Sequence, residues 1–342
     1  MSKLVYSEAE LCAEHDYARP QLEAGYRLHG GFAADGSYLS PRTAVRWPAV
    51  QAWQAALQRR GWPLIDATTR LLQRPHYPSF AQQKLLLDDG QGQTLWNSLT
   101  VTGVIEARGK RLAQFEPPDF AAIVADDIAG TCVGHLHKGL LKAHGYDEGG
   151  LPERGEGGHD VMWFAARDLL FGKDAYPMPE IPESLARPEL GRLMPQLPLA
   201  HEQTILMLMN VLMIEIRAEA SFQFSMQLAR DPGLFRDRRA DAEHAAELIG
   251  RIRQDEAIHV AYLQTAVSEL RSFTFKTADG GTVAGKDVID PVWSGMVNYH
   301  SVIVVDQNQQ RTRETIAARL LTLPDGERRL AAFDALEQRL AA

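Results

Sequence analysis

The sequence predicts an all-α fold with one minor β-hairpin. Apolar residues recur at helical spacing over long stretches, and Pro or Pro-Gly punctuates them. Residues 173–198 contain six prolines, which exclude a regular helix, so this segment is expected to cross the molecule as an irregular connection. The hairpin is expected around Asp279-Gly280, a dipeptide typical of tight turns between strands.

The helical pattern is strongest in two long segments that a short turn at Pro232-Gly233 separates, so they are expected to pack as an antiparallel pair. Residues 94–107 are apolar and rich in β-branched side chains, and they fit a strand or a helix equally well. Gly145 is a candidate helix stop. The helices expected in chain order cover 41–60, 119–144, 152–171, 199–229, 239–273 and 291–321, with a short amphipathic helix at the C-terminus.

Composition excludes several classes of function. With 45% apolar and 23% charged residues among 342, the chain is typical of a folded, water-soluble protein. A net charge of −8 without a cluster of Lys and Arg argues against a nucleic-acid partner. The first residues lack the pattern of a signal peptide, and the most apolar stretch, 205–214, is shorter than the roughly 20 residues that span a bilayer. A cytoplasmic protein that does not span a membrane is expected.

A metal site is predicted at Glu256 and His259, in the run Arg-Gln-Asp-Glu-Ala-Ile-His. A spacing of three puts both side chains on one helix face, about 5–6 Å apart at Cβ. A carboxylate buried there without compensation would cost several kcal/mol, so a cation is expected beside it. Apolar residues at helical spacing from one or the other place this face in a core: Ile249, Ile252, Val260, Leu263 and Val267.

Acids on other helices extend this pattern. Glu215 and Glu219 lie on an apolar stripe of the preceding helix, where two carboxylates repel unless a positive charge lies near them. Upstream, Glu156-Gly-Gly-His159 is a second Glu-x-x-His, and Asp126-Asp127 precedes it. Di-iron and di-manganese carboxylate bundles have two such halves, each with an acid on one helix followed by Glu-x-x-His on the next.

The chain resembles the ferritin-like di-iron carboxylate superfamily, which includes the ribonucleotide reductase small subunit, bacterial multicomponent monooxygenases and acyl-carrier desaturases. Residues 253–259 are similar to the Arg-Asp-Glu-x-x-His element of the reductase subunit, and 214–222 resemble its preceding acidic helix. The resemblance covers roughly 119–272 and implies a four-helix bundle that holds two metal ions. The ligands that it implies are Asp127, Glu156, His159, Glu215, Glu219, Glu256 and His259.

Several alternatives stay open within this set. Asp126 can take the place of Asp127, and one of Glu215 and Glu219 can be the ligand. The glycines around Glu156 disfavour a helix there, so Glu106, His135 and His137 are substitutes for the upstream ligands. Asp255 is expected to orient a ligating histidine from behind. Tyr262 is the one candidate for a radical tyrosine, and the reductase role itself is disfavoured.

The expected organisation is an N-terminal covering segment over 1–117, the metal-binding bundle over 118–273, and a hairpin with C-terminal helices over 274–342 that pack on the bundle. The segments outside the bundle are expected to build a substrate pocket and a homodimer contact. Carboxylates with few cysteines favour iron or manganese, with two Fe ions as the first expectation and Fe/Mn or Mn/Mn as alternatives.

The expected function is a non-haem di-iron oxidase or oxygenase that activates O₂ and acts on a small organic metabolite. The sequence contains no flavin, iron–sulfur or nicotinamide motif, so electrons are expected from an external donor or from the substrate. Two alternatives use the same bundle. One is a non-catalytic ferritin-like protein that binds iron or manganese, and the other is a metal-dependent hydrolase.

Overall fold

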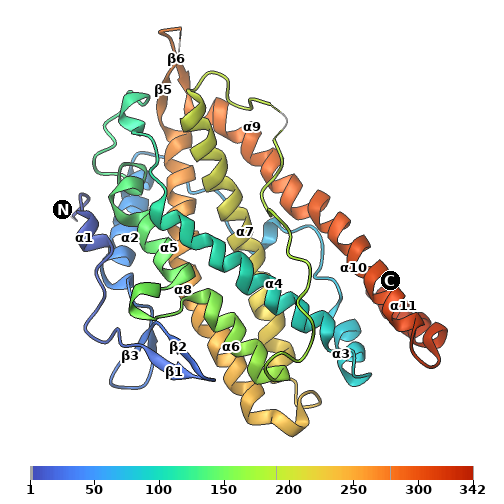
Figure 1. Ribbon diagram of the computed structural model, residues 1–342. Helices are drawn as coiled ribbons and strands as arrows, with labels where there is room; N and C mark the ends of the chain where they lie inside the picture. The colour runs from blue at the N-terminus through green and yellow to red at the C-terminus, as the bar shows by residue number, and fades with distance from the viewer. Residues whose placement is uncertain (1–2, 190, 278, 342) are drawn as a thin grey trace.

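Two long antiparallel helices, α7 and α8, form the centre of the protein (Figure 1). The computed structural model describes residues 3–189, 191–277 and 279–341. Helix α6 packs on α8, α4 packs on α6, and the short α5 lies against both α4 and α6. The bounds of these helices are Gln93–Gly109 for α4, Leu141–Gly149 for α5, His159–Phe171 for α6, Leu199–Arg230 for α7 and Arg239–Ser272 for α8.

The all-α expectation is confirmed at the level of a mostly helical chain with a few short strands. The long pair expected at 199–229 and 239–273 is α7 and α8, and the ambiguous segment 94–107 is helical as α4. In the described part of 173–198 the chain forms no helix, as its prolines predict. It runs as an extended segment across α4 and α7 (Figure 1).

The prediction of one helix over 119–144 is wrong. The backbone of Ile123 and Ala125 instead hydrogen-bonds to Lys276 and Thr274 of the C-terminal hairpin, which holds this part extended. Gly139 then has a positive φ of 109°, which breaks any regular helix. The segment contains 3₁₀ turns at Phe120–Ala122 and Val133–His135 and a kinked π-helical turn at Leu136–Leu140, after which α5 begins.

The predicted helix over 152–171 begins later than expected. A 3₁₀ turn at Pro152–Arg154 is followed by a tight loop, and α6 starts only at His159. The backbones are too close here for side chains, since a Cβ on Gly158 would lie 2.4 Å from the carbonyl oxygen of Asp147. These glycines therefore bring the start of α6 directly against the end of α5.

The N-terminal region covers one side of the long helices. Helix α2 packs on α8, while two small antiparallel ribbons, β1–β2 and β3–β4, lie near one end of α6 (Figure 1). A further short segment, the 3₁₀ turn Thr69–Leu71, contacts α7. The remaining elements are α1 Glu8–Leu11, β1 Gln21–Glu23, β2 Tyr26–Leu28, β3 Gly31–Phe32, β4 Tyr38–Leu39, α2 Thr43–Arg59, α3 Phe80–Asp88 and a 3₁₀ turn Lys110–Gln114.

The C-terminal region begins with the expected hairpin, β5 Thr274–Lys276 paired with β6 Thr282–Ala284. The helix expected over 291–321 starts earlier, as α9 Gly285–Asn298, and continues through a π-helical turn into α10 Val304–Leu321. Helix α11, Gly326–Ala341, folds back on α10 and contacts α3. Among the described residues no helix combines the length and apolar character that crossing a bilayer requires.

The apolar interior has two main parts, and a polar layer separates them along the long helices. On α7 the first part ends at Ile216 and the second begins at Phe222. On α8 the second part ends at Ile252 and the first resumes at Ile258. Asp255 and Glu256 of α8 lie in that interval and His259 lies directly beside it, so the fold places a charged layer between two hydrophobic cores.

Candidate metal centre

Six buried side chains from four helices meet in this polar layer, and a seventh lies beside them. They form two overlapping groups that share Glu148 and His259, and each group could hold a metal ion. Glu106 of α4 approaches from the side, with its carboxylate 4.0 Å from Nδ1 of His159. The buried six are His144 and Glu148 on α5, His159 on α6, Glu215 on α7, and Glu256 and His259 on α8.

Glu256 lies between two histidines. Its Oε1 is 2.7 Å from Nδ1 of His159, while its Oε2 is 2.6 Å from Nδ1 of His259. Helical spacing explains the second contact, because residues three apart share a helix face. The two oxygens of one carboxylate thus point to different imidazoles, which is the placement that a bridging ligand needs.

Glu148 occupies a matching position opposite Glu256. Its Oε1 is 3.2 Å from Nε2 of His144, 3.4 Å from Nδ1 of His259 and 3.6 Å from Nδ1 of His159. Nε2 of His144 is also 3.4 Å from Glu215. Gly109 of α4 leaves the space for this side chain, since a Cβ there would lie 2.6 Å from Cγ of Glu148.

Three atoms of the cluster lack the hydrogen-bond partners that buried polar atoms usually have. Nδ1 of His159 and Oε1 of Glu256 are only 2.7 Å apart, yet neither atom has a hydrogen-bond partner, and Oε1 of Glu148 has none. Buried polar atoms in native proteins almost always have partners. These three unpartnered atoms lie close together, and a metal ion placed among them could give each of them a partner.

Burial and close packing shift the pKa values of the cluster residues. Burial, reinforced by the neighbouring carboxylates Glu148 and Glu256, raises the pKa of both Glu106 and Glu215 well above the usual value. Burial and the adjacent His259 lower the pKa of His144, which favours the neutral imidazole that binds metals. Among the described residues, no Lys or Arg forms an ion pair with these two glutamates.

Each ligand-like histidine on α6 and α8 has a buried aspartate behind it. Nε2 of His259 is 3.2 Å from Asp147, and Nε2 of His159 is 3.2 Å from Asp255. Such carboxylates fix the tautomer and ring orientation of metal-binding histidines and increase their basicity. The Nδ1 atoms therefore remain directed at the cluster, and Asp255 occupies the orienting position expected from the sequence.

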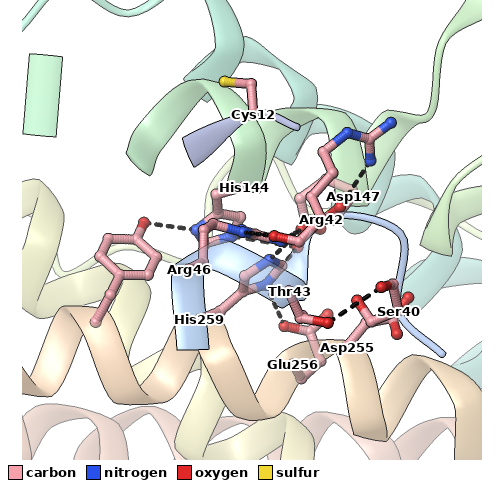
Figure 2. A network of polar contacts seen from close by, with 12 residues as sticks. Cys12, Ser40, Arg42, Thr43, Arg46, His144, Asp147, Asp255, Glu256 and His259 are labelled. Carbon is pink, nitrogen blue, oxygen red and sulfur yellow. Dashed lines mark hydrogen bonds and ion pairs between the residues drawn. The ribbon is translucent and has the colours of Figure 1, made fainter. Parts of the chain in front are cut away.

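The N-terminal region supplies the groups that stabilise these aspartates. Arg42, directly before α2, and Arg46 within α2 both bind Asp147, as Figure 2 shows beside His259 and Glu256. On the other side, His29 and the hydroxyl of Tyr38 bind Asp255 at 3.2 and 2.9 Å. The N-terminal segment therefore contributes side chains that hold the aspartates behind both His159 and His259.

His144 is held by two ring contacts. Its imidazole stacks on that of His259, with centroids 3.7 Å apart and planes 14° apart. Its Nδ1 is 2.7 Å from the hydroxyl of Tyr262, and Tyr262 is fully buried. The tyrosine considered as a radical candidate therefore lies one hydrogen bond from a cluster histidine.

The structure brings together four of the seven predicted ligands, namely His159, Glu215, Glu256 and His259, and places the other three elsewhere. Asp127 is exposed and accepts a hydrogen bond from the backbone of Ala129. Glu156 lies in the loop before α6 and faces Arg27 at 3.6 Å. Glu219 lies one turn beyond Glu215 and forms an ion pair with Arg253.

The alternatives divide in the same way. Glu106 borders the cluster, whereas Asp126 caps the hairpin by accepting from the backbone of Thr274. His135 is buried but bonds to Thr131 and to the backbone of Tyr6, and His137 is exposed. None of these last three contributes to the cluster.

Sequence reasoning missed His144 and Glu148 because Gly145 was interpreted as a helix stop. The glycine is instead inside α5, where a Cβ would lie 2.3 Å from the backbone nitrogen of Ala113. Its role is close packing rather than termination. The available signal was the spacing of His144 and Glu148, which at four residues share one helix face.

A cavity of about 660 Å³ leads from the surface to the cluster between α7 and α8. Glu215 and Glu256 line its inner end, and Ile216, Ala257 and Val260 contribute apolar surface. Volumes of this size accept small organic ligands. The cluster is therefore accessible to a small molecule from one side.

The chain matches no known family model, no curated protein and no solved structure. The evidence on function consequently rests on the site itself.

Proposed function

We propose that the protein is an O₂-activating non-haem di-iron oxidase or oxygenase that acts on a small organic metabolite, built on a ferritin-like four-helix bundle. Helix α4, the pair α5 and α6, and helices α7 and α8 would be the four members of that bundle. Each contributes at least one carboxylate to the cluster. This distribution matches the di-metal carboxylate proteins that bind metals between facing helices.

The observation that carries the proposal is the set of donors in the cluster, in which buried glutamates and histidines from several helices bring unpartnered oxygen and nitrogen atoms together. Four glutamates, Glu106, Glu148, Glu215 and Glu256, would carry −4 when ionised, and two divalent metal ions would supply +4. Arg42 and Arg46 are the nearest paired cations, but both bind Asp147 instead. Without metal, burial raises the pKa of Glu106 and Glu215 and so favours their neutral form, while, against the opposing effect of burial, the neighbouring carboxylates raise the pKa of His159 and His259 and so favour charged imidazoles beside Glu148 and Glu256. Metal ions would take the place of these protons.

Iron is the metal that we propose, because carboxylates and imidazoles without thiolates suit iron and manganese. Glu106 and His159 would hold one ion, while His144, Glu215 and His259 would hold the other. Glu148 belongs to both groups of the cluster, and Glu256 contacts both His159 and His259, so either carboxylate would be available to both ions. When bound, a pair of iron ions supplies the two electrons with which O₂ is reduced, and an external donor would restore them.

The protein's own residues would prepare the site for this chemistry. Asp147 and Asp255 keep the imidazoles of His259 and His159 oriented toward the cluster. The two apolar cores on either side exclude water from the polar layer. The cavity would admit a substrate at Glu215 and Glu256, and this is why we propose catalysis rather than iron storage.

Metal analysis and O₂ uptake test this proposal together. The metal-free protein is loaded anaerobically with Fe(II), its iron content is measured, and O₂ consumption is followed after mixing with buffer that contains O₂. About two irons per chain and rapid O₂ uptake are expected, and Glu256→Ala should lose both. Two irons without O₂ consumption would favour iron binding alone. A protein that is isolated with zinc and is indifferent to O₂ would favour a hydrolase.

A further inference from the structure

The mouth of the cavity contains a charged pair directly outside the metal cluster. Glu219 of α7 lies one turn beyond Glu215, and Arg253 of α8 lies one turn before Glu256, so both flank the entrance. Three residues along a helix correspond to about 4.5 Å. A group held by Arg253 would therefore place the next atoms of a ligand close to the cluster carboxylates.

Arg253 is the one cation among the described residues that line this cavity. The other charged lining residues are the acids Glu215, Glu219 and Glu256, and two of these belong to the cluster. For an anionic ligand that enters the cavity, this guanidinium would be the one side chain of opposite charge in the described lining. Ile216, Ala257 and Val260 also line the cavity and would contact an uncharged body.

The guanidinium already binds a carboxylate in a forked geometry. Nε of Arg253 lies 2.8 and 3.0 Å from the two oxygens of Glu219, and Nη2 lies 2.7 Å from one of them. Planar two-point contacts of this kind are the geometry in which arginine recognises carboxylates. Glu219 thus shows how a substrate carboxylate would lie.

Exchange of this internal carboxylate for an external one would cost little. The side chains of Arg253 and Glu219 are 43% and 29% exposed, and ion pairs open to solvent contribute little stability. Glu219 would also keep a partner after release, because the side-chain amide of Gln223 donates to it at 2.6 Å. The pair can open without leaving a buried charge unpaired.

We propose that Arg253 binds the carboxylate of the substrate, and that the cavity accepts a small organic acid whose apolar body reaches toward Glu215 and Glu256. This inference rests on the proposed function for the identity of the reacting centre. It adds the substrate class and assigns Arg253 as the residue that selects it. Glu219 occupies the subsite until the substrate replaces it.

Binding of paired probes tests the assignment without any turnover. Phenylacetate, its neutral analogue phenylacetamide and the cation phenethylamine are titrated into the zinc-loaded protein and followed by saturation-transfer NMR. We expect phenylacetate to bind at least tenfold more weakly to Arg253→Gln, with phenylacetamide unchanged. Glu219→Gln should strengthen phenylacetate binding several-fold, because it frees the guanidinium. Arg230→Gln, which removes an exposed arginine paired with Glu243, is the matched control.

Several outcomes would overturn this inference. These are equal binding of phenylacetate to the wild type and to Arg253→Gln, a preference for phenethylamine that depends on Glu219, and no binding of any carboxylate from acetate to phenylpropionate. Metal content measured on the same samples separates the two proposals. Loss of metal binding would defeat the proposed function, while Arg253 dependence can still be measured in metal-free protein.

Discussion

Nε2 of His259 lies 3.2 Å from Oδ2 of Asp147, a carboxylate with no exposed surface. The same aspartate binds Arg42 and Arg46, so these two guanidinium groups stabilise its negative charge beside the histidine. Asp147 can therefore accept a hydrogen bond from Nε2–H of His259, which leaves Nδ1 directed to the cluster. Asp255 and His159 repeat the arrangement on the other side.

Asp147→Asn should weaken metal binding by about 10–100-fold, the usual effect of removing a carboxylate behind a metal-bound histidine. The amide can still contact His259, but it no longer stabilises a single tautomer. Affinity is measured by competition with a chelator, on protein shown to be folded by circular dichroism. Asp168→Asn is the control, since Asp168 is also paired with an arginine, Arg167, but lies outside the cluster. Unchanged affinity in Asp147→Asn would contradict the orienting role.

The shared position of Glu148 gives a second prediction. Because Glu148 belongs to both groups of the cluster, Glu148→Gln should reduce bound metal from about two ions per chain to one or none. Glu156→Gln should retain the full content, since Glu156 faces Arg27 in a loop. Both variants keep the size of the side chain. Elemental analysis decides between them, and equal metal loss in the two would place the site elsewhere.

Access through the cavity gives a third prediction. Ala257 lines it without contributing to the cluster, so Ala257→Leu should fill space while leaving all seven polar side chains in place. We expect full metal content but a marked loss of binding of the probes named above. Ala240→Leu, at an exposed position on the same helix, controls for the added side chain. Normal probe binding in Ala257→Leu would show that ligands reach the cluster by another route.

The sequence predicted the two long helices and three of the cluster residues on them, Glu215, Glu256 and His259, because helical spacing carries this information directly. Glu256 and His259 are three apart on an amphipathic helix, so the face that they share follows from the helix geometry. Spacing could not decide between Glu215 and Glu219, which are four apart. Only the way α7 packs on α8 determines that Glu215 points inward and Glu219 meets Arg253.

The part of the site before α7 was harder to predict, because a glycine in the sequence can either lie inside a helix for close packing or end the helix. Gly145 lies inside a helix for close packing against Ala113, whereas Gly139 breaks one through its positive φ. The partner strand that holds Ile123 and Ala125 comes from a hairpin about 150 residues away in the chain. Local patterns do not contain these long-range contacts, so Glu148 was hidden and Asp127 was misplaced.

Glu269, far along α8 from the cluster, gives a prediction on stability. Its side chain is buried, and its oxygens accept hydrogen bonds from the backbone of Cys132 and Val133 at 3.1 and 2.9 Å. Burial raises its pKa to about 8, although the two backbone hydrogen bonds oppose this shift. Between pH 4.5 and about 8, Glu269 is therefore protonated in the folded state but ionised in the unfolded state, where its pKa is near 4.5.

Stability from Glu269 is consequently fully present below about pH 4.5 and is lost as the pH rises toward 8. The rise of this pKa from 4.5 to about 8 corresponds to roughly 5 kcal/mol at most. Glu269→Gln cannot ionise, so the difference in unfolding free energy between this variant and the wild type should change by a few kcal/mol in favour of the variant over that range. Urea unfolding at several pH values measures it, with the exposed Glu247→Gln as control. A difference that stays constant with pH would show that the carboxyl group is ionised throughout, stabilised by the amides of Cys132 and Val133.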